Sequence, residues 1–141
     1  MSASRVRLRE SYFDASDAAL AVWLRLLVDE IDAAEAAPAW LADAREDWHD
    51  AATMGFGFGV MPELDDFILD EDRRAVVLAL CEAAAARLRA LADPVPAATL
   101  NALGTGGADA QFQWDVPRAM FQDVADQFTA LVRDAALEPA S

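Results

Sequence analysis

The chain of 141 residues contains no lysine, one histidine and one cysteine. Every strong base is therefore arginine, and together with abundant alanine this usage indicates a GC-rich bacterial genome. A single cysteine, Cys81, allows no disulfide within the chain and gives no sign of an oxidising compartment. Glu46 and His49 have the Glu-x-x-His spacing of di-iron bundles, but such a site needs a second copy of the motif. Since no second histidine exists, the second copy is missing, and the sequence favours a surface histidine within reach of acids over a di-iron site.

Long apolar runs are also missing. The longest, Ala18–Leu24 and Ala75–Cys81, are far too short to cross a bilayer. The first ten residues carry three arginines and lack the apolar stretch and small-residue cleavage site of a signal peptide. We therefore expect a soluble, cytoplasmic protein with no membrane attachment.

Signatures of catalysis and of cofactor binding are absent from the sequence as well. No serine stands in a Gly-x-Ser-x-Gly elbow. Cys81 falls on the apolar side of a predicted helix, where burial raises a thiol pKa instead of activating the group. The glycine runs at 55–59 and 104–107 have neither dinucleotide-binding spacing nor a P-loop lysine, and the acids of 65–72 do not follow the EF-hand pattern. We expect no enzymatic activity, no metal and no cofactor.

Negative charge is what the chain has in excess, and all of the net charge lies in its first half. Between Asp14 and Asp72 there are 16 acids and two arginines, a net of −14, whereas the remainder has nine acids and nine arginines. With 55% hydrophobic residues the chain can form a core, so it is not a disordered acidic tail. This charge argues against binding to nucleic-acid phosphates or anionic lipid and favours a cationic protein partner.

Apolar periodicity predicts a single domain over residues 1–141, with a mainly α fold in which four to five helices form a compact bundle. The expected helices cover 17–36, 38–52, 70–91, 97–103 and 117–135, and Asp115 is the expected cap of the last one. Apolar residues that alternate with arginines near the N-terminus predict a short edge strand or an extended arm. Similar alternation at 111–116 predicts another short strand, which could pair with the N-terminal one.

The strongest local pattern is a stripe of four acids, Asp43, Glu46, Asp47 and Asp50, on one face of the second helix. Like charges at this spacing cost a few tenths of a kcal/mol per pair, so the stripe is either tolerated or used. Acids at 29–35 and 65–72 flank it. On a binding function, the expected contact residues are the stripe with Trp40, Trp48, Asp65, Asp66 and Asp70.

The four tryptophans suggest either core packing or hot spots for a partner. Trp23 and Trp114 lie in apolar stripes and are expected in the core. Trp40 and Trp48 border the acidic helix, and core positions are expected for them too. If either is exposed, it would be a natural anchor for a partner.

The acidic run Asp43–Asp50, the loop Gly55–Pro62 and the helical layout resemble small acidic bacterial immunity proteins, which protect a cell from its own or a sister cell's toxin. The resemblance implies a non-catalytic protein that binds a basic toxin or effector domain and covers its active or substrate-binding surface. Four alternatives remain open from the sequence. They are a DNA-mimic inhibitor, an effector chaperone or adaptor, a metal-binding helical bundle, and an acidic face that is only solvated.

Overall fold

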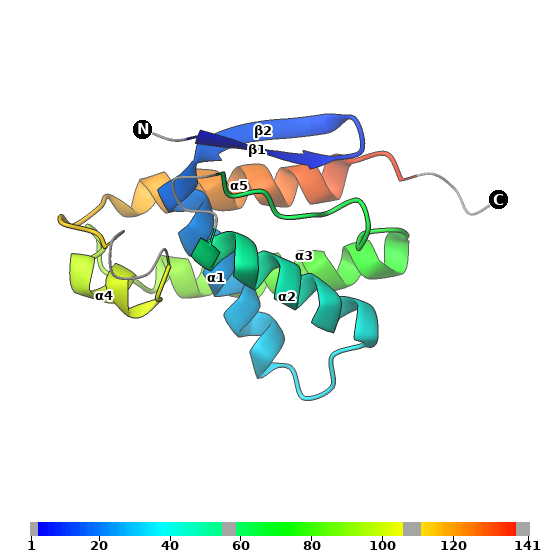
Figure 1. Ribbon diagram of the computed structural model, residues 1–141, viewed down its shortest axis with the longest axis horizontal. Helices are drawn as coiled ribbons and strands as arrows, with labels where there is room; N and C mark the ends of the chain where they lie inside the picture. The colour runs from blue at the N-terminus through cyan, green and yellow to red at the C-terminus, as the bar shows by residue number, and fades with distance from the viewer. Residues whose placement is uncertain (1–2, 55–58, 106–110, 138–141) are drawn as a thin grey trace.

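The structure, a computed structural model, describes residues 3–54, 59–105 and 111–137. A β-hairpin, β1 (Ala3–Leu8) and β2 (Ser11–Ser16), precedes α1 (Asp17–Ala33) and α2 (Ala39–Met54). Then follow α3 (Glu71–Arg89), α4 (Ala97–Ala102) and α5 (Arg118–Asp134). The prediction of a mainly α bundle with four to five helices is confirmed for the described residues, and the hairpin lies along α5 (Figure 1).

Helix α1 is the centre of the bundle. It starts at the predicted cap, since the Ser16 side chain accepts a hydrogen bond from the Ala19 amide. It packs against α2, α3 and α5, which explains why its apolar residues are buried on nearly every side. The ring of Phe128 on α5 meets Phe13, Trp23 and Trp48 in edge-on contacts. This aromatic cluster joins the hairpin, α1, α2 and α5 in one core.

Helices α3 and α5 each supply an arginine to the C-terminal end of the other. Arg74, in the first turns of α3, is buried and donates to the carbonyls of Val132, Arg133 and Ala135 at the end of α5. Arg118, the first residue of α5, donates to the carbonyls of Arg89 and Leu91 at the end of α3. A cation at a helix C-terminus pairs with its unsatisfied carbonyls and with the helix dipole. Each arginine therefore ties the start of its own helix to the end of the other helix, so the pair is joined at both of its ends.

The segments that precede α4 and α5 are joined in a similar crosswise manner. Val95 and Val116 form an isolated antiparallel bridge. Asp115 caps the Ala97 amide of α4, and Asp93 accepts from the Arg118 amide of α5. The expectations that Asp115 caps the last helix and that 111–116 pairs with the N-terminal strand are therefore wrong.

Trp114 corrects another expectation, because it is 78% exposed and lies outside the core. Its alternation with apolar neighbours indicated a strand that packs on the core. In the structure Val116 forms an isolated bridge and the Asn101 side chain binds the backbone of Phe112, but neither contact turns the Trp114 ring inward.

The N-terminal strand exists, but its partner is β2, with Ala3 opposite Ser16 and Leu8 opposite Ser11. The two-residue turn between them places Arg9 at a φ of 57°, a conformation that usually needs glycine. A distant segment holds it there. Asp65 accepts hydrogen bonds from the Arg9 amide and guanidinium, and the guanidinium also donates to the carbonyl of Ile68.

Candidate partner-binding face

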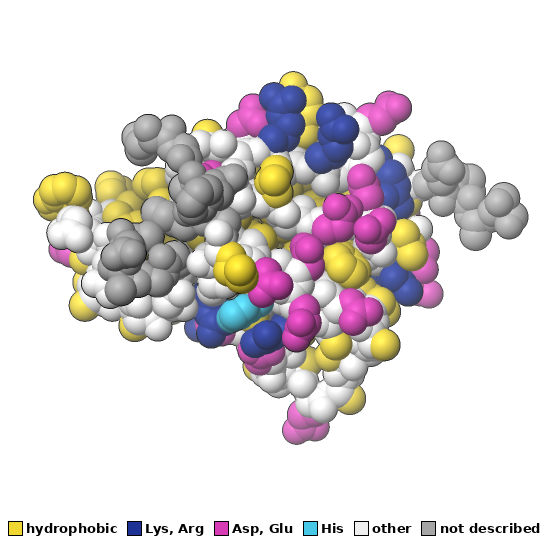
Figure 2. Space-filling view, viewed as in Figure 1, with side chains coloured by type: hydrophobic (Ala, Val, Ile, Leu, Met, Phe, Trp, Pro, Cys, Tyr) yellow, Lys and Arg dark blue, Asp and Glu magenta, His cyan; other side chains and the backbone are white. Residues whose placement is uncertain are grey.

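Helix α2 separates apolar from acidic side chains as predicted. Leu41, Ala44, Trp48 and Ala52 are buried against the bundle. Asp43, Glu46 and Asp50 are exposed, and they form no ion pair with an arginine of the described residues. Figure 2 shows acidic side chains gathered over α2 and over the segment beside it, while arginines stand over the hairpin.

Asp47, the fourth member of the stripe, has a structural contact. Its carboxylate accepts a hydrogen bond of 2.7 Å from the Glu63 amide. The indole N–H of the neighbouring Trp48 donates to the Glu63 carbonyl at 2.8 Å. Two consecutive residues of α2 thus bind both backbone groups of Glu63. This contact positions the segment after α2.

Residues 59–70 run along α2 before α3 begins, with one tight turn in which the amides of Phe67 and Ile68 donate to the Leu64 carbonyl (Figure 1). Near one end the Val60 amide donates to the Ser4 hydroxyl, and near the other Arg9 binds Asp65. Phe67 packs edge-on against Trp48. These contacts, with those of Asp47 and Trp48, place Glu63 beside the α2 stripe. Asp66 is an exposed acid of the same segment.

The acids of 29–35, at the end of α1, are largely neutralised by arginines. Asp29 and Glu30 lie 3.4–3.6 Å from the guanidinium groups of Arg25 and Arg87. Arg45 of α2 donates two hydrogen bonds to Asp32, and these bonds hold the pKa of that carboxyl below its ordinary value. The free negative surface is therefore smaller than the sequence charge suggests.

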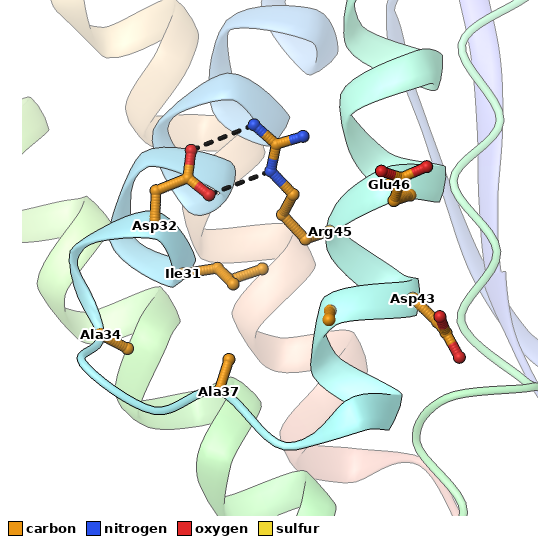
Figure 3. Close-up of a pocket in the computed structure, with 8 residues that line it drawn as sticks. Ile31, Asp32, Ala34, Ala37, Asp43, Arg45 and Glu46 are labelled. Carbon is orange, nitrogen blue, oxygen red and sulfur yellow. Dashed lines mark hydrogen bonds and ion pairs between the residues drawn. The ribbon is translucent and has the colours of Figure 1, made fainter.

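A shallow cleft of about 640 Å³ lies between the end of α1, the 34–38 connection and α2. Figure 3 shows Ile31, Ala34 and Ala37 on its apolar side and Arg45 reaching across to Asp32. Asp43 and Glu46 extend from the opposite side of α2 and form the acidic margin of the cleft.

The remaining predicted contact residues have mixed surroundings. Asp70 is the N-cap of α3, where its side chain accepts from the Arg73 amide, and Asp65 is bound by Arg9. Trp40 is half-buried, with the Arg73 guanidinium 4.9 Å from its ring centre. Trp48 is fully buried and therefore cannot anchor a partner.

One exposed side chain was overlooked at the end of the stripe. Met54 lies eleven residues after Asp43 and four after Asp50, and it is 73% exposed. Helical spacing alone could have placed it on the same side of α2 as Asp50. The stripe therefore ends in an apolar, adaptable side chain.

Within 3–54, 59–105 and 111–137, no cluster of three or more His, Cys, Asp or Glu side chains is arranged to hold a metal. Cys81 is buried as expected, and burial raises the pKa of its thiol to about 12 despite a hydrogen bond with Thr129. Of the expected loop Gly55–Pro62, residues 55–58 lie outside the described residues, and residues 59–62 are neither helix nor strand, as predicted. Across the described ranges no helix is both long and apolar enough to span a bilayer.

Comparisons with protein families, with curated proteins and with solved structures find no match for this chain. The acidic face denotes the side chains of Asp43, Glu46, Asp50, Glu63 and Asp66 together with Met54.

Proposed function

We propose that this protein is a non-catalytic binding protein that neutralises a cationic protein partner, and that the acidic face is its contact surface. The partner class implied by the sequence resemblance is a basic toxin or effector domain, whose active or substrate-binding surface would be covered. The observation that carries the proposal is the set of exposed carboxylates on α2 that form no ion pair with an arginine of the described residues, beside a segment that adds Glu63 and Asp66.

The distribution of arginines supports a specific surface over a general negative coat. Several arginines bind carbonyls or acids elsewhere in the fold, as Arg74, Arg118 and Arg87 do. The outer side of α2 has no such compensation in the described residues, although Arg45 lies on the same helix. A patch of one sign speeds the encounter with a partner of opposite sign and makes it sensitive to salt.

A DNA-mimic inhibitor is the less well supported alternative function. It requires long, evenly spaced rows of carboxylates over an elongated surface. The acids at the end of α1 are paired with arginines, and Asp47 holds Glu63, so the described residues leave one short stripe.

The test removes three charges from the acidic face and compares the result with equal removal elsewhere. The site variant is Asp43→Asn, Glu46→Gln and Asp50→Asn. The control variant is Glu82→Gln, Asp123→Asn and Asp126→Asn, three exposed acids on α3 and α5. Each changes the net charge from −14 to −11 (−14 + 3).

The two variants are mixed in stopped flow with a basic toxin domain encoded by a neighbouring gene, over a range of salt concentrations. We expect the site variant to associate at least about tenfold more slowly at low salt and with a flatter salt dependence. The control should remain near wild type. Equal slowing of both variants would show that net charge acts without a defined surface. Absence of binding, together with no rescue of growth on co-expression with the toxin domain, would refute the proposed function.

A further inference from the structure

The cleft between the end of α1 and α2 has an apolar side made of small side chains. Ala34, Ala37 and Ala42 line it and are all exposed, together with the buried Ile31. Its volume of about 640 Å³ lies within the range of ligand-binding pockets, roughly 300–1,000 Å³. Because the cleft is shallow, a side chain of a protein partner can enter it while the partner's backbone stays at the surface.

The 34–38 connection that forms one wall of the cleft is held at both ends. At one end the Ala34 amide donates to the Ile31 carbonyl. At the other end the Ala42 amide donates to the Pro38 carbonyl. The cleft is therefore formed before a partner arrives, and a preformed site costs less to occupy because fewer groups must be ordered on binding.

The charges that line the cleft leave a negative excess at one margin. Arg45 donates two hydrogen bonds of 3.0 and 3.1 Å to Asp32, so these two groups neutralise each other (Figure 3). Asp43 and Glu46 form no ion pair with an arginine of the described residues. The four charges thus sum to −2 (−1 + 1 − 1 − 1). Glu46 follows Ala42 by four residues and lies on the same side of α2, so an apolar side and a negative margin adjoin.

We propose that this cleft receives one arginine side chain of the cationic partner. The apolar stem of that arginine lies over Ala34, Ala37 and Ala42, and its guanidinium binds Glu46 and Asp43. A long basic side chain can cover apolar surface with its stem while its charged head reaches polar groups. The inference rests on the proposed function, to which it adds the side chain that the partner inserts.

Arginine suits this margin better than lysine. Asp43 and Glu46 are three residues apart on a helix, so their carboxylates are neighbours on its surface. A planar guanidinium offers five donors in a fixed fork and can bind both, whereas an ammonium is a compact and strongly hydrated charge. Arg45 already places one guanidinium at this cleft, with only 30% of its side chain exposed.

The first test uses the whole chain, isotopically labelled, and three blocked peptides, Gly-Arg-Gly, Gly-Lys-Gly and Gly-citrulline-Gly. Citrulline has the shape of arginine without its charge. Amide chemical shifts are followed by NMR as each peptide is added at low salt. We expect the arginine peptide to shift the amides of 34–37 and 42–46 along one saturating curve, and the other two to shift them much less. Equal binding of the citrulline peptide would overturn the recognition of charge, and equal binding of the lysine peptide would overturn the assignment to arginine.

Two pairs of variants locate the binding site. Ala42→Phe fills the cleft with an exposed ring, whereas Ala79→Phe places the same ring on the exposed side of α3. Glu46→Gln removes a charge from the margin, whereas Asp50→Asn removes one from the acidic face outside the cleft. Circular dichroism verifies that each variant is folded.

We expect Ala42→Phe to abolish the shifts caused by the arginine peptide. Glu46→Gln should weaken its affinity about two- to fivefold, the range of an exposed ion pair. Ala79→Phe and Asp50→Asn should bind nearly as wild type does. If Asp50→Asn weakens binding as much as Glu46→Gln, or if Ala42→Phe leaves the shifts unchanged, the cleft is not the site.

The toxin domain used to test the proposed function separates the two conclusions. Ala42→Phe should raise its dissociation rate by at least about tenfold and leave association nearly unchanged, because short-range contacts act on dissociation and long-range charge acts on association. A dissociation rate equal to that of wild type would refute the cleft as the arginine site, even where removal of the three acids slows association and supports the proposed function. If the toxin domain does not bind, the proposed function fails, and the peptide titrations alone decide whether the cleft binds arginine.

Discussion

Replacing Arg74 with methionine tests how much the contacts of this arginine with the end of α5 contribute to the stability of the fold. Methionine keeps the apolar stem inside the bundle but removes every donor to the end of α5. The guanidinium makes hydrogen bonds of 3.0, 2.5 and 2.6 Å to the carbonyls of Val132, Arg133 and Ala135, and its side chain is only 10% exposed.

A hydrogen bond to a charged group contributes about 1.5–3 kcal/mol net. The three bonds share one guanidinium, and the Arg133 carbonyl is only partly buried, so their contributions should not add fully. We expect Arg74→Met to lower the free energy of unfolding by about 3 kcal/mol. In a chain of this size that corresponds to a fall in Tm of roughly 10 °C.

Urea unfolding followed by circular dichroism measures this loss, and Arg89→Met is the control. Arg89 lies on the same helix, is exposed and forms no ion pair with the described residues, so its replacement should change stability by less than about 0.5 kcal/mol. If the two variants differ by less than about 1 kcal/mol, the arginine does not hold the end of α5 as the distances imply.

Three further outcomes follow from single contacts. Asp47→Ala should destabilise the fold by about 1–3 kcal/mol in urea unfolding because it leaves the Glu63 amide without its acceptor, whereas Asp43→Ala on the same stripe should be neutral or slightly stabilising. Arg45→Met should raise the pKa of Asp32, measured by carboxyl-detected NMR titration. Arg45 lowers this pKa in the folded state. The contribution of Asp32 to stability is therefore present above the ordinary carboxyl pKa and is lost as the pH falls through the lowered pKa. An unchanged Asp32 titration in the variant would contradict this cause. Cys81 should resist alkylation at mildly alkaline pH in the native protein and react rapidly in denaturant, since burial raises its pKa to about 12; rapid native labelling would show that the α3–α5 contact opens readily.

The helices could be located from the sequence because their signals are local. Ser16 and Asp70 are caps whose side chains bind amides three residues ahead, and the apolar periodicity of α1 and α5 matches the sides that they bury.

The hairpin could not be found in this way. Its turn has no glycine or asparagine signal, and Arg9 keeps its positive φ through Asp65, which is 56 residues away along the chain. A local pattern carries no information about such a partner.

The same limit applies to the acidic face. The stripe on α2 was correctly placed on one side of the helix, but helical spacing could not reveal that Asp47 binds Glu63 while Asp43 and Glu46 remain free. Likewise, Asp115 precedes a proline and a helix, as a cap often does. Its carboxylate nevertheless accepts a hydrogen bond from the Ala97 amide of α4. Each correction concerns a contact between segments that lie far apart in the sequence.

The exchange of arginines between α3 and α5 has a consequence for how the molecule opens. Since the end of each helix is held by a residue near the start of the other, neither end can fray while the opposite helix stays docked. The amides of the last turns of α3 and α5 should therefore exchange together, with a common opening free energy, although they lie at opposite ends of the pair. The two helices then behave as one cooperative folding unit.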